Sequence, residues 1–299
     1  MCSGHGTIWP PEKLQDRTSL STSATHENLR RSIRSLATIY RKKTRRRVRI
    51  VDFQLEDKVA IVTGSSRGLG LSTASSLVAE GCKVLAVARS AEELQKFEAE
   101  NPGSVRACVC DMQDIEAVKA LPARAIEAFG RLDIVVNNAG IAPAGKFLEQ
   151  DDRVWEEVFA INVTAPALLA KVAGRHMIAQ GSGKIINIAS TSGILGKALL
   201  VAYSSSKGAV LQFTKALAAE LARKGVQVNA IAPGAFATDA QRVVLDSPDL
   251  HARRVAKIPA KRMADSDEIG PMVCYLASPL SDFVTGSVFV IDGGESSKL

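Results

Sequence analysis

Short apolar runs recur along most of the chain, and segments long enough to form a helix separate them. The runs are 59–63, 83–88, 105–109, 132–136, 185–189, 226–231 and 287–291. Near-continuous apolar runs are typical of parallel strands that are buried on both faces, because helices cover such a sheet on both sides. The sequence therefore predicts an α/β fold with a single doubly wound, seven-stranded parallel sheet, helices on both faces and right-handed crossovers.

Residues 1–54 lack this alternation, and they carry most of the positive charge. The first 55 residues hold 12 Lys and Arg against 4 Asp and Glu, whereas residues 56–299 hold 26 against 27. Four apolar residues recur at helical spacing before the basic run 41–47: Leu29, Ile33, Leu36 and Tyr40. A transit helix, a membrane-surface anchor or a nucleic-acid-binding arm would fit this pattern. We expect a basic, disordered extension instead, or upstream sequence read from a wrong start, because acidic residues interrupt the composition of a transit peptide.

Composition argues against several other classes of protein. No stretch of about 18 or more uncharged apolar residues occurs, so we expect no membrane-spanning helix. The cysteines form no C-x-x-C pair and the histidines are scattered. Neither a disulfide framework nor a metal site is therefore expected. Because residues 56–299 are nearly neutral, we expect no nucleic-acid partner.

A glycine-rich segment follows the first apolar run and precedes a helix-length stretch. It reads Thr-Gly-Ser-Ser-Arg-Gly-Leu-Gly over residues 63–70. Glycines let the backbone approach a pyrophosphate closely, and the start of a helix offers free N–H groups and a positive dipole. The segment therefore predicts a dinucleotide-binding loop. Its binding residues are Gly64, Ser66, Arg67, Gly68, Leu69 and Gly70.

The end of the second apolar run indicates which dinucleotide binds. Sites for NAD(H) place a carboxylate there to hold the ribose 2′-hydroxyl, whereas a 2′-phosphate requires a cation. This chain has Val-Ala-Arg-Ser at residues 87–90, with Arg89 and no acidic residue, and Arg67 lies in the glycine loop. We predict that NADP(H) is preferred over NAD(H); the alternative is that both arginines are simply exposed.

Tyr203 and Lys207 are four residues apart, so on a helix they share one face. A phenol titrates near pH 10, and a neighbouring cation lowers this value toward the range useful for proton transfer. Ser190 ends an apolar run thirteen residues before Tyr203. Because ligands bind at the carboxyl ends of strands in open α/β sheets, we expect Ser190 to lie in the same site.

Together these segments resemble the short-chain dehydrogenase/reductase family. The likeness covers about residues 55–294 and includes the G-x-x-x-G-x-G spacing, the sequence Asn-Asn-Ala-Gly at 137–140 and the interval between Ser190 and Tyr203. It implies a Rossmann-fold catalytic domain over residues 55–299, with a tail at 295–299. It also implies a catalytic tetrad of Asn162, Ser190, Tyr203 and Lys207, in which Asn162 anchors a water beside Lys207.

The same resemblance implies further contacts to the dinucleotide and a reaction that needs no metal. The implied residues are Asp111, Met112, Asn138, Ala139, Gly140, Tyr203, Lys207, Pro233, Gly234, Phe236 and Thr238. The expected reaction is reversible hydride transfer between a nicotinamide and a carbonyl or secondary alcohol. In it, Tyr203 donates the proton and Ser190 orients the oxygen. A homotetramer is also implied.

The substrate class is predicted from the candidate pocket residues Ala142, Ile194, Leu195 and Phe236, which are apolar. They favour a 3-oxoacyl-reductase-like enzyme. The alternatives are a sugar or polyol (gluconate-type) dehydrogenase and a non-catalytic NADP-binding sensor. We expect a lid over residues 239–262. Its cations would meet the phosphate of an acyl thioester or face solvent: Arg242, Arg253, Arg254 and Lys257.

The chain ends in Ser297-Lys298-Leu299, the tripeptide that directs proteins to peroxisomes. We therefore expect the protein in the peroxisomal matrix if its source is eukaryotic, and in the cytoplasm otherwise.

Overall fold

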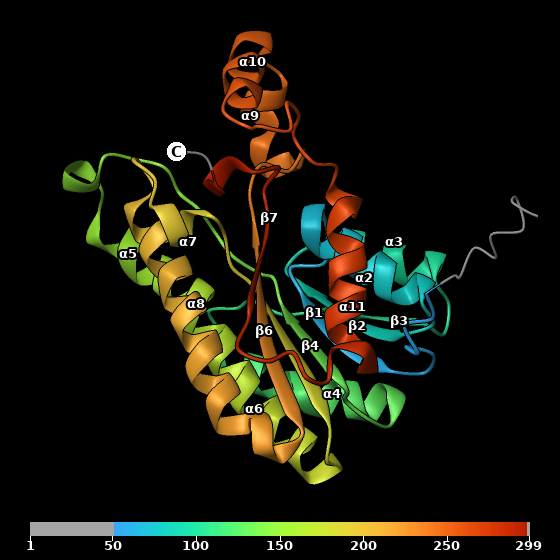
Figure 1. The fold of residues 1–299 in the computed structure, drawn as a ribbon. Helices are drawn as coiled ribbons and strands as arrows, with labels where there is room; N and C mark the ends of the chain where they lie inside the picture. The colour runs from blue at the N-terminus through green and yellow to red at the C-terminus, as the bar shows by residue number, and fades with distance from the viewer. Residues whose placement is uncertain (1–50, 298–299) are drawn as a thin grey trace, which may run out of the picture. The chain divides into compact units, whose positions relative to one another are not determined.

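A seven-stranded parallel sheet organises the part of the protein that the computed structural model describes, residues 51–297 (Figure 1). Its strands are β1 (Val59–Thr63), β2 (Lys83–Ala88), β3 (Val105–Val109), β4 (Ile134–Asn137), β5 (Gly183–Ile188), β6 (Val226–Pro233) and β7 (Val288–Ile291). They pair in the order β3-β2-β1-β4-β5-β6-β7, all in parallel. The predicted fold is confirmed. The hypotheses for residues 1–50, and for Lys298 and Leu299 of the terminal tripeptide, lie outside the described residues.

The strands read as apolar runs because both of their faces are buried. On β1, Val59 and Ile61 point into one core cluster, whereas Ala60 and Val62 point into the other. Successive side chains of a strand alternate between the two faces, so each layer of helices needs its own set of apolar residues. A seven-stranded sheet of this kind therefore carries two hydrophobic cores.

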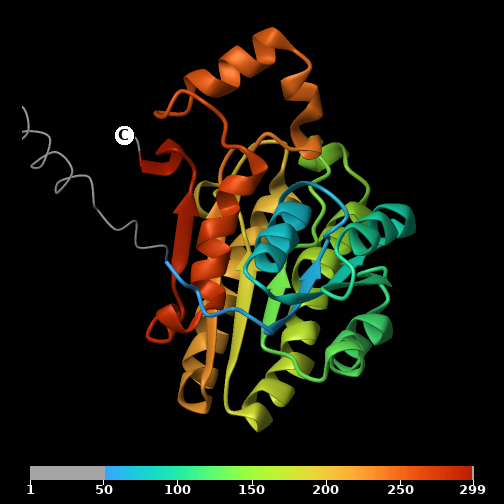
Figure 2. The same ribbon diagram turned by 90° about the vertical axis from the view of Figure 1, so that its right-hand side faces the viewer.

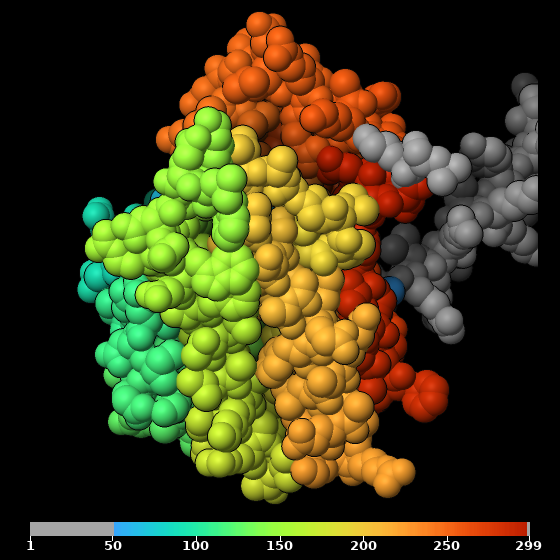
Figure 3. Space-filling view, turned by 90° about the vertical axis from the view of Figure 1, so that its left-hand side faces the viewer, coloured from blue at the N-terminus to red at the C-terminus, as the bar shows by residue number. Residues whose placement is uncertain are grey.

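Helices form one layer on each face of the sheet (Figures 1 and 2). The first core contains side chains of α2 (Gly68–Ala79), α3 (Ala91–Glu100) and α11 (Gly270–Ala277). The second contains side chains of α4 (Ile115–Phe129), α6 (Ala165–Gln180) and α8 (Val201–Leu221). Figure 3 shows the face on which α5 (Asp152–Phe159), α6 and α8 lie side by side.

The remaining helices are short, and most lie at the carboxyl end of the sheet. They are α7 (Ser192–Leu195), α9 (Arg242–Leu245), α10 (Pro248–Ala256), a π-helical turn at Ala160–Thr164, and 3-10 turns at Phe147–Glu149, Ala222–Lys224, Asp239–Gln241, Ser266–Ile269, Pro279–Ser281 and Glu295–Ser297. Helices α9 and α10 project beyond the strand ends (Figures 1 and 2). The segment predicted to form a lid is therefore mainly helical.

The strand order places a crevice at this end of the sheet. β1 pairs with β2 on one side and with β4 on the other, so the connections leave β1 and β4 toward opposite faces. Such a switch point opens a gap outside the carboxyl ends of the strands, where ligands bind in open α/β sheets.

Within residues 51–297, one helical stretch, Asp152–Gln180, is long and apolar enough to cross a membrane by length and composition. Half of its apolar window is buried inside the fold. Leu169, Ala173 and Met177 belong to the second core, which is how the core helix of a globular domain packs.

Candidate active site

A cleft of about 480 Å³ lies at the carboxyl ends of the strands. Its wall includes all the residues predicted for cofactor binding: Gly64, Ser66, Arg67, Gly68, Leu69, Gly70, Arg89, Asp111, Met112, Asn138, Ala139, Gly140, Tyr203, Lys207, Pro233, Gly234, Phe236 and Thr238. Ser190 lies on the same wall. The fold thus brings together segments that are up to 174 residues apart in the sequence, from Gly64 to Thr238. That these residues contact a dinucleotide remains a prediction.

The glycine loop is shaped by a close approach between its own ends. A side chain at Gly70 would place its Cβ 2.0 Å from the carbonyl oxygen of Gly64 and 2.4 Å from Nδ2 of Asn138. Gly64 itself has a φ of +69°, a conformation that favours glycine. Helix α2 can therefore begin directly against the end of β1, with its first N–H groups at the cleft.

The start of α2 is suited to an anion. Arg67, at the N-cap, makes no capping hydrogen bond with its side chain, and the first turn contains no acidic residue. The positive end of the helix dipole therefore lies on the cleft wall without a carboxylate from its own first turn. These residues fit the pyrophosphate of a dinucleotide, which Gly68, Leu69 and Gly70 would hold.

Replacing Gly70 by Ala should disrupt this loop, because the added methyl group meets backbone that cannot move freely. We expect at least tenfold weaker binding of NADPH and a thermal midpoint lowered by roughly 5–10 °C. The control is Gly174→Ala in α6, where the new Cβ would lie 3.6 Å from Leu221 and should be tolerated. Fluorescence titration and thermal unfolding measure both effects; unchanged binding in Gly70→Ala would contradict this account of the loop.

Asn138 fastens the glycine loop to the neighbouring strand. Its Nδ2 donates to the carbonyl oxygens of Thr63, at 2.9 Å, and Gly64, at 3.2 Å. The hydroxyl oxygen of Thr63 accepts from the backbone N–H groups of Asn138 and Ala139. Asn138 therefore keeps the ends of β1 and β4 in register at the floor of the cleft.

Tyr203, Ser190 and Lys207 form a cluster at the end of β5. The phenol of Tyr203 is hydrogen-bonded to the side chain of Ser190. The ammonium of Lys207 donates to the carbonyl oxygen of Ile188 at 2.7 Å and lies 5.8 Å from the centre of the Tyr203 ring. The helical spacing of Tyr203 and Lys207 thus places both side chains on the face of α8 that meets β5.

Burial governs the titration of this cluster. It lowers the pKa of Lys207 to about 8. Burial also raises the pKa of Tyr203, and the hydrogen bond to Ser190 offsets this rise only in part. The spacing in the sequence predicts that Lys207 lowers the pKa of Tyr203. The structure differs because loss of hydration is the dominant effect on both groups.

Asn162 does not line the cleft; it supports the cluster from behind. It lies in the π-helical turn and is 1% exposed. Its Oδ1 accepts from the backbone N–H of Ile141 at 2.9 Å, and its Nδ2 donates to the Ile141 carbonyl and to the hydroxyl of Ser206, both at 3.0 Å. A Cβ on Gly140 would lie 3.1 Å from Asn162 Oδ1 and 3.5 Å from Lys207 Nζ. Asn162 therefore lies beside Lys207, and its place in the catalytic tetrad stays a prediction.

The structure separates the four apolar residues proposed for the substrate pocket. Ala142 and Phe236 lie on the cleft wall, whereas Ile194 and Leu195 are exposed on α7 outside it. The wall also includes residues that were not predicted to bind, each within or near a motif: Ser90, Cys110, Ile141, Ile188, Ala189 and Gln241. Extending each motif by one or two residues at the strand end would have found most of them.

Two comparisons with known proteins identify the family of this chain. A family model described as enoyl-(acyl carrier protein) reductase matches residues 64–296. A galactitol 2-dehydrogenase (L-tagatose-forming) of Cereibacter sphaeroides is 39% identical over 245 residues, which are 81% of this chain and 96% of that protein. The chain belongs to the short-chain dehydrogenase/reductase family.

Other members of the short-chain dehydrogenase/reductase family act on different substrates. The 3-oxoacyl-(acyl-carrier-protein) reductase of Vibrio cholerae is 36% identical over 244 residues, covering 80% of this chain and 98% of that protein. A gluconate 5-dehydrogenase from Burkholderia cenocepacia, solved in complex with NADP and tartrate, is 33% identical with a TM-score of 0.78. That match covers 83% of this chain and 98% of the other. The protein is therefore an oxidoreductase that acts on alcohol or carbonyl groups.

The cluster can perform the proton chemistry of a short-chain dehydrogenase/reductase. The nicotinamide, when bound, supplies or accepts the hydride. Ser190 Oγ can donate a hydrogen bond to a carbonyl oxygen, and Tyr203 Oη can deliver a proton to that oxygen as negative charge develops on it. When protonated, Lys207 places a positive charge 5.8 Å from the centre of the Tyr203 ring, which favours the phenolate against the opposing effect of burial.

In this short-chain dehydrogenase/reductase, the segment predicted to form a lid is joined to the C-terminal segment. Arg254 of α10 makes a two-pronged ion pair with Glu295, and both side chains are 18% exposed. The backbone N–H of Ala260 donates to the carbonyl oxygen of Gly293 at 3.0 Å. Arg254, one of the four lid cations considered for a thioester phosphate, is therefore already paired with a carboxylate.

Proposed function

We propose that this enzyme uses NADP(H) to interconvert a ketone and a secondary alcohol, and that its ketone substrate is of the 3-oxoacyl type. The observation that carries the proposal is the hydrogen-bonded pair of Ser190 and Tyr203 beside the buried Lys207, at the end of the cleft formed by β5 and α8. A phenol and a hydroxyl held together in this way can share the oxygen of a carbonyl group.

Two arginines support the choice of NADP(H). Arg67, within the glycine loop, and Arg89, directly after β2, both lie on the cleft wall, and both are exposed. Ser66 and Ser90 lie on the same wall and can donate to a phosphate. A 2′-phosphate would pair with the guanidinium groups, whereas the 2′-hydroxyl of NAD(H) would leave them without an anionic partner.

Arg89→Ala should separate the two cofactors. We expect the Kd of NADPH to rise about tenfold or more, because a charge-assisted hydrogen bond is lost, while the Kd of NADH changes little. Arg106→Ala is the matched control, because Arg106 is exposed on β3 and pairs with Glu98 rather than lining the cleft. Fluorescence titration gives both constants. Equal weakening of NADPH and NADH binding by Arg89→Ala would contradict a role in holding the 2′-phosphate.

Apolar side chains at the carboxyl end of the sheet support an acyl substrate. Ile194 and Leu195 on α7 are 45% and 59% exposed, and Val243 on α9 is 77% exposed. Both helices lie at the cleft end of the molecule (Figure 1). Exposed apolar groups at this end of the sheet could contribute to a surface that covers an apolar ligand.

A second candidate is oxidation of a polyol or a sugar acid. The relative from Cereibacter sphaeroides, which is 39% identical to this chain, is a galactitol dehydrogenase. The solved relative from Burkholderia cenocepacia holds NADP together with tartrate, a hydroxy acid. The hydrogen-bonding cluster around Tyr203 serves either substrate, because both reactions place one oxygen between Ser190 and Tyr203.

The decisive experiment compares the two substrate classes on the same enzyme. Reduction of an acetoacetyl thioester with NADPH is measured against oxidation of galactitol and gluconate with NADP, in each case by nicotinamide absorbance. A kcat/KM at least about 100-fold higher for the thioester supports the 3-oxoacyl assignment; this ratio corresponds to about 2.7 kcal/mol of transition-state preference. The reverse ratio overturns that assignment in favour of the polyol reaction.

A further inference from the structure

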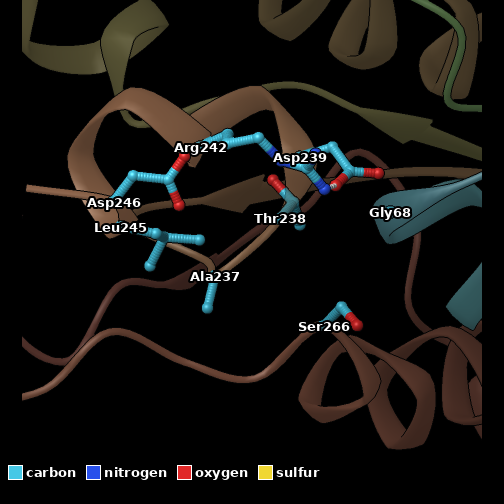
Figure 4. Close-up of a pocket in the computed structure, with 8 residues that line it drawn as sticks. All are labelled: Gly68, Ala237, Thr238, Asp239, Arg242, Leu245, Asp246 and Ser266. Carbon is cyan, nitrogen blue, oxygen red and sulfur yellow. Dashed lines mark hydrogen bonds and ion pairs between the residues drawn. The ribbon is translucent and has the colours of Figure 1, made fainter.

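A second pocket, of about 400 Å³, adjoins the dinucleotide cleft (Figure 4). Its lining residues are Gly68, Ala237, Thr238, Asp239, Arg242, Leu245, Asp246 and Ser266. Gly68, Thr238 and Asp239 also line the larger cleft, so the two spaces share a wall. The pocket therefore connects the start of α2 to the first helix of the lid, α9.

Arg242, the first residue of α9, is held in this pocket by a weak partner. Its Nη2 donates to Oδ1 of Asp239 at 2.8 Å, and the two side chains are 71% and 47% exposed. Figure 4 shows the Arg242 side chain reaching toward Asp239, with Thr238 close to both. An exposed ion pair of this kind contributes little to stability, so another anion can displace the carboxylate.

The anion that would displace Asp239 is the pyrophosphate of the dinucleotide, and it would lie at the start of α2. Gly68 is the first residue of α2, and the first turn of this helix has no acidic residue. A Cβ on Gly68 would lie 3.6 Å from Cβ of Thr238, which places the helix start against the segment that leads into the lid. A pyrophosphate at this helix start would place two negative charges beside Gly68, which lines the same pocket as Arg242. The guanidinium can bind two of its oxygens at once, whereas Asp239 now occupies one nitrogen.

We propose that Arg242 binds the pyrophosphate of the dinucleotide by exchanging Asp239 for phosphate oxygens, and that this exchange draws α9 over the bound cofactor. Asp239 is then the resting partner that keeps Arg242 at the pocket when no dinucleotide is present. The inference holds for NADP(H) and NAD(H) alike, because both contain the pyrophosphate, and it does not depend on the substrate class.

The test rests on two substitutions with opposite expected effects on affinity. Arg242→Ala should raise the Kd of NADPH and of ADP-ribose about tenfold, because a charge-assisted contact is lost, and should leave the Kd of nicotinamide mononucleotide unchanged. Asp239→Asn should lower the Kd of NADPH two- to fivefold, because it releases Arg242. Arg253→Ala, which alters a lid residue that lines neither pocket, is the matched control.

The double variant Asp239→Asn/Arg242→Ala separates exchange from simple charge repulsion. If Asp239 acts through Arg242, Asp239→Asn has no effect on affinity once Arg242 is absent. A gain that persists in the double variant overturns the exchange. So does a weakening of NADPH binding by Asp239→Asn, because that outcome would make the ion pair a structural support. An unchanged Kd in Arg242→Ala, with unfolding midpoints like those of the parent protein, overturns the contact itself.

Limited proteolysis provides a readout of lid closure that does not require turnover. Saturating NADPH should protect the segment 239–256 from cleavage in the parent protein and in Arg253→Ala, but not in Arg242→Ala. Equal protection of all three proteins would contradict a role for Arg242 in closing α9.

Discussion

Tyr203→Phe should lower kcat by about 10³-fold, with Kd for NADPH within about twofold of the parent value. The substitution keeps the ring that packs beside Lys207 and removes only the hydroxyl that is hydrogen-bonded to Ser190. General acid–base catalysis by a positioned side chain contributes about 10²–10⁴-fold, and among residues 51–297 no other phenol lines the cleft. Steady-state kinetics and fluorescence titration of the same preparation give the two constants.

The matched control is Tyr275→Phe, which removes a phenol from α11, outside the cleft. It should leave kcat unchanged. A Tyr203→Phe variant that retains more than about a tenth of the parent kcat would contradict the assignment of Tyr203 as the proton donor.

Lys207→Met should abolish most activity and yet stabilise the protein near neutral pH. Lys207 is 5% exposed, and its pKa falls from 10.5 to about 8 on folding, so burial of the ammonium opposes folding by roughly 3 kcal/mol at pH 7. Methionine removes that cost but leaves the carbonyl of Ile188 without its donor, which costs about 1 kcal/mol. We expect a net gain of about 2 kcal/mol in the free energy of unfolding, with kcat about 100-fold lower.

The gain should shrink as the pH rises. Between about pH 8 and 10.5 the unfolded chain keeps the proton on residue 207 and the folded protein has lost it. The contribution of Lys207 to the free energy of unfolding therefore increases with pH across this window. Urea denaturation of the parent protein and of Lys207→Met at pH 7 and pH 9.5 measures the difference between their free energies of unfolding. The contributions of the other titrating groups cancel in this difference. A difference that does not change with pH, or a variant less stable at pH 7, would contradict the cost of burying this charge.

The strands could be predicted because burial on two faces leaves a continuous apolar signature. Their ends were harder to predict where a charged residue is satisfied by a distant partner. β5 starts at Gly183, two residues before the apolar run, and includes Lys184, which is 8% exposed. Its Nζ reaches Asp282 at 2.6 Å, across 98 residues of sequence. No local pattern shows that a lysine will have such a partner.

The candidate site could be predicted to the extent that it lies at the ends of strands, where motifs occupy fixed positions. The contacts that the sequence did not indicate are those that depend on packing. The pKa of Tyr203 rises because the ring is buried, and Arg254 finds its anionic partner, Glu295, outside the predicted lid, 41 residues further along the chain. Spacing along the chain predicts which side chains face the cleft, but not how much water surrounds them.

The pairing of Arg254 with Glu295 bears on any attempt to graft a new specificity onto this scaffold. A lid transplanted from a relative without an arginine at the position of Arg254 would leave Glu295, in the turn at Glu295–Ser297, without its cation. The N–H groups of Glu295 and Ser296 in that turn donate to Asp292, which follows β7, so the turn is bound both to the end of the sheet and to the predicted lid. Chimeras should therefore exchange residues 239–262 and 292–297 as one unit, although 29 residues separate them in the sequence.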